Sequence, residues 1–327
     1  MRRGAGLALA LLLAACGPQR SSAAPASIQV DAVAVPEWDP GATPARPDHF
    51  AYAGGLHLTS KDTSRLHGLS DLEVLSDGRM IAVSDEGDLV RGRIVLDAEG
   101  RLAGVADVTL GPLTGLDGKP LSGAKTDSDS EGLALWPNGD LMISFERRHR
   151  IWLYPAAGGP PRAVPFPDAP FPDNEGMEAL AIDTKSGPDA YIVGREDTRE
   201  TWRCRLSAGC EPSFKVGGIG QGWLVSARPM PPLGTGSDDG WVFLLRDYNP
   251  LTKQDTIRIL ITDAAGKVRD THVIARPATV DNFEGVAALP GKDGGVRLYI
   301  IADDNFSASE RTLLLAFDWR PAPGGKP

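Results

Sequence analysis

The sequence predicts an all-β fold, a β-propeller of five four-stranded blades, from three observations. A motif of two short apolar strands joined by a turn recurs five times at intervals of roughly 45 to 65 residues, which is typical of repeat architectures. The chain has 38 Gly and 27 Pro, which favours many turns over long helices. Each repeat also offers further short strands, and almost no segment has helical periodicity, so a propeller is indicated.

The repeat is clearest between Asp129 and Arg147. An acidic start is followed by an apolar strand, a Pro-Asn-Gly-Asp turn at residues 137–140, a second apolar strand and a charged end. The five copies cover residues 68–86, 129–147, 174–196, 222–247 and 282–305. A six-bladed ring is the alternative, if the long unit 68–116 splits or an N-terminal blade is hidden.

The outer strands follow each inner pair in order. They are expected at residues 89–96 and 102–110, 150–154 and 162–166, 201–206 and near 214, and 256–262 and 268–275. The last repeat, with strands at 285–289, 296–302 and 312–319, lacks one strand. We expect residues 50–58 to pair with this C-terminal blade and close the ring, which protects an exposed edge.

The N-terminus reads as an export signal. Arg2 and Arg3 precede an apolar run at residues 7–13 that is too short to span a bilayer. Residues 13–16, Leu-Ala-Ala-Cys, are similar to a bacterial lipoprotein box, which predicts a signal peptide over 1–15 and lipidation of Cys16. Ordinary secretion is the alternative. The expected location is the periplasmic face of the cell envelope, with the outer membrane favoured by Gly17.

The predicted domain organisation follows from composition. Residues 16–47 are rich in Pro, Ala and Ser and are expected to form a flexible tether, followed by a propeller domain over 48–320 and a disordered tail over 321–327. Loss of the signal peptide would change the formal net charge from −9 to −11. An acidic monomer of this kind is a poor nucleic-acid binder but is compatible with cations, and its membrane contact would be the lipid alone.

Two cysteines remain in the expected domain. Cys204 and Cys210 are six positions apart, around Leu-Ser-Ala-Gly at residues 206–209, in a chain predicted to be exported. A disulfide across a hairpin is therefore expected, since a metal pair would need further His or Cys ligands nearby.

Acidic residues recur at the start of the inner strands. Aligning the copies places Ser70, Glu131, Glu178, roughly Ser226, and Glu284 at this position. Several carboxylates converging on one axis would repel one another, and a bound cation would relieve that repulsion. Oxygen ligands suit Ca²⁺ best here, or Mg²⁺. Alternatively, these Glu residues cap turns or pair with Arg residues of the next blade.

The end of the second strand is charged in every copy. Arg147, Arg195 and Arg246, with His149, are candidates for binding an anionic or ester substrate. Asp85, Asp303 and Asp304 could ligate a metal or act as a base. Whether strand starts and strand ends meet at one face stays open. The sequence has no zinc-ligand spacing of its His residues, no Gly-x-Ser-x-Gly motif and no phosphate-binding Gly loop.

From Phe50 to Trp319 the chain resembles the bacterial family called "esterase-like activity of phytase", the phytase-like domain proteins. The stretches that carry the resemblance are residues 129–134 with 144–150, and 279–285 with 303–307 and 311–314. The resemblance implies an exported propeller that hydrolyses a phosphoester or an ester.

Three hypotheses follow. The first is a hydrolase in which a divalent cation is held by Glu131, Glu178 and Glu284, with Asp85 and Asp304, and in which Glu131, Glu146 and Asp303 are catalytic. The second is a sugar lactonase of the gluconolactonase kind, with Glu131, Asn282 and Asp303 around the cation. The third is a non-enzymatic periplasmic binding protein or scaffold.

Overall fold

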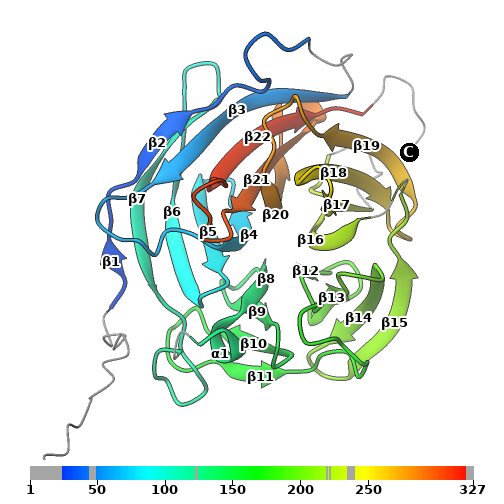
Figure 1. Ribbon diagram of the computed structural model, residues 1–327. Helices are drawn as coiled ribbons and strands as arrows, with labels where there is room; N and C mark the ends of the chain where they lie inside the picture. The colour runs from blue at the N-terminus through cyan, green and yellow to red at the C-terminus, as the bar shows by residue number, and fades with distance from the viewer. Residues whose placement is uncertain are drawn as a thin grey trace, which may run out of the picture.

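The protein is a ring of five β-sheets around one axis, as the computed structural model shows (Figure 1). The structure describes residues 24–43, 49–121, 124–218, 220, 222–233 and 240–321. Each sheet is a blade whose strands follow chain order from the axis outward, with β4, β8, β12, β16 and β20 innermost. The predicted five-bladed propeller is therefore confirmed.

Each blade contains four consecutive antiparallel strands, apart from the fifth, which takes one strand from near the N-terminus. Blade 1 contains β4 (Leu69–Val74), β5 (Arg79–Ser84), β6 (Asp88–Leu96) and β7 (Leu102–Pro112), and blade 2 contains β8 (Ser130–Leu135), β9 (Leu141–Phe145), β10 (Arg150–Tyr154) and β11 (Arg162–Val164). Blade 3 contains β12 (Ala179–Ile182), β13 (Ala190–Gly194), β14 (Glu200–Arg205) and β15 (Gly209–Lys215), and blade 4 contains β16 (Trp223–Pro229), β17 (Gly240–Asn249), β18 (Gln254–Asp263) and β19 (Val268–Ile274). Blade 5 contains β20 (Asn282–Pro290), β21 (Val296–Asp303), β22 (Leu313–Trp319) and β3 (Phe50–Thr59).

The inner two strands of each blade are apolar because both of their faces pack against other blades. Every residue of β9 is buried, and so is every residue of β13. Between the strands of the motif the turn is tight: Gly139 has a φ of 90°, and Asn138 Oδ1 accepts a hydrogen bond from Asp140 N at 3.0 Å. Gly tolerates this left-handed conformation, and Asn and Asp bond back to the turn, so the Pro-Asn-Gly-Asp sequence specifies the reversal.

The segment before the propeller is more ordered than expected. We predicted a flexible tether over residues 16–47, but β1 (Ala26–Ser27) pairs with β7 and β2 (Asp31–Ala34) pairs with β3. These short strands cover the outer edges of blades 1 and 5, and Ile28 between them is buried. β3 itself pairs with β22, with Leu314 opposite Leu56. The predicted signal peptide, the predicted lipidation site Cys16 and residues 322–327 lie outside the described residues.

Two short helices interrupt the strands in the residues that the structure describes. α1 (Lys125–Ser128) lies between blades 1 and 2, and a single 3₁₀ turn, η1 (Lys292–Gly294), lies between β20 and β21. Within the described part of the chain, no helix is long and apolar enough to cross a membrane. In blade 3, Cys204 faces Cys210 across β14 and β15, and their sulfur atoms are 1.98 Å apart.

A buried ion pair fills the axis of the ring. Asp71 is fully buried on β4 and Arg228 is almost fully buried on β16, and Arg228 Nη2 lies 3.0 Å from Asp71 Oδ2. Asp71 also accepts hydrogen bonds from Ser226 Oγ at 2.9 Å and from Leu133 N at 2.8 Å.

The same network reaches the two remaining blades. Arg228 Nη1 donates to Leu180 O at 3.3 Å on β12, and Ser226 Oγ accepts from Val286 N at 3.2 Å on β20. The inner strands of all five blades are therefore tied together by two charged residues and one serine.

Candidate functional site

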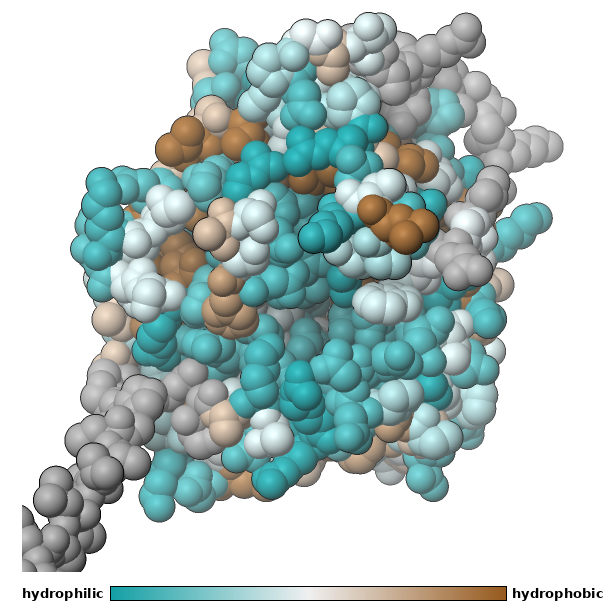
Figure 2. Space-filling model, viewed as in Figure 1, coloured by the Kyte–Doolittle hydropathy of each residue, from teal (hydrophilic) through white to brown (hydrophobic). Residues whose placement is uncertain are grey.

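Next to this network, the axis opens into a small acidic pocket. The pocket has a volume of about 140 Å³ and is lined by eight carboxylate and three basic side chains, together with two Asn and one Trp. The lining residues are Asp85, Lys125, Asp129, Glu131, Glu146, Arg147, Asn174, Glu178, Glu196, Trp223, Arg246, Glu284, Asp303 and Asn305. Figure 2 shows mainly hydrophilic residues around the centre of the ring on the face that it displays.

Strand starts and strand ends meet in this pocket, which answers the question that the sequence left open. Because the two inner strands of a blade are antiparallel, the first residue of one lies beside the last residue of the other. Ser130 pairs with Phe145 in blade 2, and Asn282 pairs with Asp303 in blade 5. Glu131 and Glu146, and likewise Glu284 and Asp303, are thus brought to the same face.

Two of the inner-strand Glu residues occupy irregular positions in the strand pairing. The register shifts between Ser130 and Leu133 and again between Phe283 and Gly285, so Glu131 and Glu284 lie in β-bulges. A bulge re-aims a side chain, and here it turns the carboxylates toward the axis. The following Gly allows close packing, since a Cβ on Gly285 would lie only 2.7 Å from the Asp71 Cα.

The equivalent positions in blades 1 and 4 carry no charge. Ser70 is buried and does not line the pocket. In blade 4 the register shift falls at Val225, while Ser226, expected at the strand start, lies in the axial network instead. At this strand-start position, only blades 2, 3 and 5 carry an acid, namely Glu131, Glu178 and Glu284. The fivefold repeat of this acid is therefore incomplete.

One side of the pocket is partly neutralised. Lys125 Nζ forms an ion pair with Asp85 and another with Asp129 at 3.1 Å, and Arg147 Nε lies 2.6 Å from Asp129 Oδ2. Burial raises the pKa of Asp85, and this effect exceeds the opposite effect of the charge and hydrogen bond of Lys125. Arg147 also donates to Asn174 Oδ1 at 2.6 Å.

The other side is a group of buried acids with fewer partners. Burial, and then the charges of neighbouring acids, raise the pKa of Glu131 and of Glu178 well above the usual range. Burial also raises the pKa of Glu146 to about 7 and that of Glu196 to about 8. Glu146 Oε1 is buried without a hydrogen-bond partner among the described residues. These carboxylates strongly favour either protons or a cation.

Arg246 is the basic residue at the centre of the site. Its Nη2 lies 3.6 Å from Glu284 Oε1 and 3.8 Å from Glu196 Oε1, and burial leaves the Nε without an acceptor within the described part of the chain. Glu284 also accepts a hydrogen bond from Asn282 Nδ2 at 2.9 Å. For Glu284, the alternative of pairing with an Arg of the neighbouring blade is therefore correct.

Two sets of carboxylates could hold a metal ion, because their oxygen atoms lie within 4.8 Å of one another. One set is Asp129, Glu131 and Glu146, and the other is Glu146, Glu178 and Glu196. The predicted triad of Glu131, Glu178 and Glu284 does not form such a set among the described residues. Glu146 belongs to both sets. Its buried Oε1, which has no hydrogen-bond partner among the described residues, is free to act as a ligand of a cation.

Several predicted site residues lie elsewhere. Arg195 is bound to Asp197, with its Nε 2.5 Å from Asp197 Oδ1, and does not line the pocket. His149 contacts the carbonyl oxygen of Pro172 at 2.8 Å and also lies outside the lining. Asp304 holds its own turn, accepting from Thr312 Oγ1 at 3.0 Å. Local partners thus occupy these three side chains.

Sequence reasoning missed other lining residues. Asp129 and Glu196 belong to the repeat and were visible in it, but their neighbours Glu131 and Arg195 were chosen instead. Asn174, Trp223 and Asn305 lie at the borders of the copies. Lys125 lies on α1, outside the repeat, and no pattern in the sequence pointed to it.

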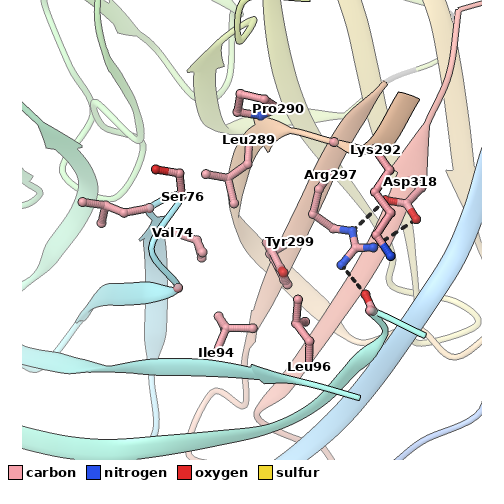
Figure 3. A pocket seen from close by; sticks show the side chains of 14 residues that line it. Val74, Ser76, Ile94, Leu96, Leu289, Pro290, Lys292, Arg297, Tyr299 and Asp318 are labelled. Atoms are coloured by element: carbon pink, nitrogen blue, oxygen red, sulfur yellow. Dashed lines mark hydrogen bonds and ion pairs between the residues drawn. The ribbon is translucent and has the colours of Figure 1, made fainter. Parts of the chain in front are cut away.

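A larger hollow exists away from these acids. It has a volume of about 310 Å³ and lies between blades 1 and 5, with Val74, Ile94, Leu289 and Tyr299 in its walls (Figure 3). Arg297 also lines the hollow, and its guanidinium group donates two hydrogen bonds to the Asp318 carboxylate, as the dashed lines show. The hollow is chiefly apolar, so the acidic pocket is the stronger candidate for chemistry.

The fold and the site define a five-bladed propeller with an acidic axial pocket. Residues 64–197 match the model of the phytase-like family, which is described as "Esterase-like activity of phytase". The resemblance seen in the sequence is therefore confirmed over these residues. The matched part contains six of the eight carboxylates of the pocket, while Glu284 and Asp303 lie beyond it.

The chain is also similar in shape to solved propellers of low identity. The allergen Mala s 1 of Malassezia sympodialis is 13% identical, with a TM-score of 0.46, over 84% of this chain and 89% of that chain. The calcium-binding protein regucalcin of Agrobacterium tumefaciens strain C58 is 15% identical, with a TM-score of 0.45, over 82% and 85%. A candidate gluconolactonase is 16% identical, with a TM-score of 0.44, over 82% and 81%. No protein of curated function matches the chain.

Proposed function

We propose that the protein is an ester hydrolase that uses a divalent cation in the axial pocket. The observation that carries the proposal is the set of Glu146, Glu178 and Glu196, whose carboxylate oxygens lie within 4.8 Å of one another. Three buried carboxylates at this spacing need a positive charge, and an all-oxygen set suits Ca²⁺. The phytase-like match supports an activity on esters.

The Glu178 set is the better cation site of the two. In the other set, Asp129 has close ionic partners in Lys125 at 3.1 Å and Arg147 at 2.6 Å, whereas Glu196 has a longer contact of 3.8 Å with Arg246. A cation bound by Glu146, Glu178 and Glu196 would polarise the ester carbonyl and make a water molecule more acidic.

The chain's own residues complete the reaction. Glu131 shares the other carboxylate set with Glu146, and a cation bound nearby would favour its ionised form, in which it takes a proton from the attacking water. Arg246 Nε, a buried donor without an acceptor among the described residues, is available to the carbonyl oxygen as it gains negative charge. The water oxygen bonds to the acyl carbon, the bond to the alcohol oxygen breaks, and the alcohol leaves with the proton from Glu131. Asp303, fixed by a hydrogen bond from Asn305 N at 2.7 Å, is a second residue placed for proton transfer.

The charge of the pocket favours an uncharged substrate. When all eight carboxyl groups are ionised, they face three basic groups, and one divalent cation still leaves an excess of negative charge. A phosphomonoester would be repelled, whereas a carboxylic ester would not. A lactone is an internal carboxylic ester, so the sugar-lactonase alternative uses the same site. We also propose that the protein is exported and anchored through Cys16, as the residues of the signal segment suggest.

The proposal is tested with purified protein and three substrates: 4-nitrophenyl acetate, glucono-lactone and 4-nitrophenyl phosphate. We expect hydrolysis of a carboxylic ester or the lactone that is lost in EDTA and restored by Ca²⁺. Glu178→Gln should weaken calcium binding at least tenfold in calorimetry, because it removes one anionic ligand. Glu211→Gln, at an exposed position of β15, is the matched control and should bind normally. Activity that is unchanged by EDTA would contradict the proposal.

The pocket also predicts how stability depends on pH when no cation is bound. The folded-state pKa of Glu196 is about 8 and that of Glu146 about 7, both above the ordinary value of 4.5. The folded protein therefore holds more protons than the unfolded chain between pH 4.5 and 8, and its free energy of unfolding falls as the pH rises through this window.

Urea unfolding in EDTA at pH 5 and pH 8 measures this effect. The decrease should be smaller in Glu196→Gln, which has no titrating group at this position, than in Glu211→Gln. Calcium should restore stability more at pH 8 than at pH 5, since protons compete with it at the lower pH. Equal slopes in the two variants would show that Glu196 does not titrate in this range.

A further inference from the structure

A second cavity opens directly beside the acidic pocket. It has a volume of about 540 Å³ and shares Trp223 and Arg246 with the pocket. Its walls come from the turn between β13 and β14 in blade 3 and from β17 in blade 4. A molecule that lies in this side groove, as we call it, can therefore extend a group into the acidic pocket.

Two exposed aromatic rings form part of the groove. Trp223 is 43% exposed and Tyr248 is 46% exposed, although such large rings usually lose most of their contact with water. The Arg246 guanidinium lies 5.1 Å from the centroid of the Trp223 ring, which holds the indole in place by a cation–π contact. Exposed, fixed aromatic rings beside a site provide flat surfaces for a ligand ring.

The polar groups of the groove include both donors and acceptors. Arg199 Nη1 is buried and has no hydrogen-bond partner among the described residues. Across the groove, the Asp247 carboxylate is 39% exposed and lies 3.7 Å from its nearest cationic atom, Arg258 Nη1. Asp197 adds a second carboxylate. The lining therefore suits a ligand that donates to the carboxylates and accepts from the guanidinium group of Arg199 or Arg246.

We propose that the side groove binds a neutral sugar ring, so that the substrate is a sugar ester whose ester group reaches the acidic pocket. This substrate class depends on the proposed hydrolase function. The apolar C–H face of a sugar ring packs on an indole, and its hydroxyl groups donate to carboxylates and accept from arginine. An aryl ring would offer no hydroxyl group to Asp247 or Arg199, and a phosphate group would be repelled by Asp197 and Asp247.

Binding of sugars without a scissile bond tests the groove independently of catalysis. A panel of methyl glycosides of glucose, galactose, mannose and xylose is titrated into the protein, with saturation-transfer NMR as the readout. We expect at least one glycoside to bind, and its dissociation constant to rise at least tenfold in Trp223→Ala and in Tyr248→Ala. Phe166→Ala is the matched control, since Phe166 is also exposed but lies outside the groove, and it should bind as the wild type does.

The kinetic experiment uses a monoacetylated methyl glycoside and 4-nitrophenyl acetate. Tyr248→Ala should raise KM for the sugar ester at least tenfold, with kcat changed much less, because Tyr248 contacts the sugar and not the ester. Far-UV circular dichroism and the urea midpoint of each variant establish that it is folded.

The outcomes separate this inference from the proposed function. Glycoside binding that depends on Trp223 and Tyr248, without any ester hydrolysis, would support the groove and overturn the hydrolase. Hydrolysis of 4-nitrophenyl acetate without glycoside binding would overturn the sugar subsite alone. Glycoside binding that survives both alanine substitutions would also overturn it.

Discussion

Glu131→Gln is expected to lower kcat for ester hydrolysis by about 10²- to 10⁴-fold, the usual contribution of a general base. Glu131 is buried in the axial pocket, and the β-bulge in β8 aims its carboxylate inward. Gln has the same size and keeps one oxygen, but it cannot take a proton from water. Calcium binding should change little, because we assign the cation to Glu146, Glu178 and Glu196.

Rapid-mixing or steady-state assays with 4-nitrophenyl acetate measure kcat, and calorimetry measures calcium affinity on the same sample. Glu178→Gln provides the contrast, since its primary loss should be calcium affinity. If Glu131→Gln loses calcium binding as strongly as Glu178→Gln does, Glu131 is a ligand and not the base. Full activity in Glu131→Gln would exclude it from the reaction.

Arg228→Met should destabilise the fold by about 3–5 kcal/mol, the cost of leaving a buried charge unpaired. Arg228 is the ionic partner of two acids, Asp71 at 3.0 Å and Glu73 at 3.1 Å. Without it, Asp71 stays in the centre of the ring with no countercharge. Met fills a similar volume, so the loss reflects charge more than packing.

Urea unfolding at pH 7.5 measures the change in the free energy of unfolding. Adding Asp71→Asn to Arg228→Met should recover part of the loss, because the second substitution removes the unpaired charge. Arg79→Met is the control: Arg79 pairs with Asp77 at the surface, and its loss should leave the unfolding midpoint unchanged. A small effect of Arg228→Met, similar to that of the control, would mean that the axis does not depend on this ion pair.

The fold was predictable because the sequences of the five blades repeat the same local pattern. An apolar run, a Gly- or Asn-containing turn and a second apolar run recur along the chain. A propeller buries such pairs of apolar strands between neighbouring blades. The strands β1 and β2 escaped prediction because two to four residues of mixed polarity carry no periodic signal. These two segments become strands by pairing with the outer edges of blades 1 and 5. Those edges exist only after the ring has assembled, so the local sequence does not reveal the pairing.

The site was predictable only as far as the repeat extends. Alignment of the repeat copies selected five acids as candidates, and all five line the pocket: Glu131, Glu146, Glu178, Glu284 and Asp303. The repeat could not show which charged residues at strand ends turn inward. Arg195 and Arg246 occupy equivalent ends, yet Arg195 finds Asp197 two residues later, while Arg246 faces acids of other blades.

The buried pair of Asp71 and Arg228 has a further consequence for the order of events. Because both side chains are buried on the axis, they fill the centre of the ring at this level in the part of the chain that the structure describes. The side groove shares Trp223 and Arg246 with the acidic pocket, so a substrate bound in the groove would cover that side of the pocket. On the proposed function, we therefore expect the cation to bind before the ester and a bound substrate to slow the release of the cation.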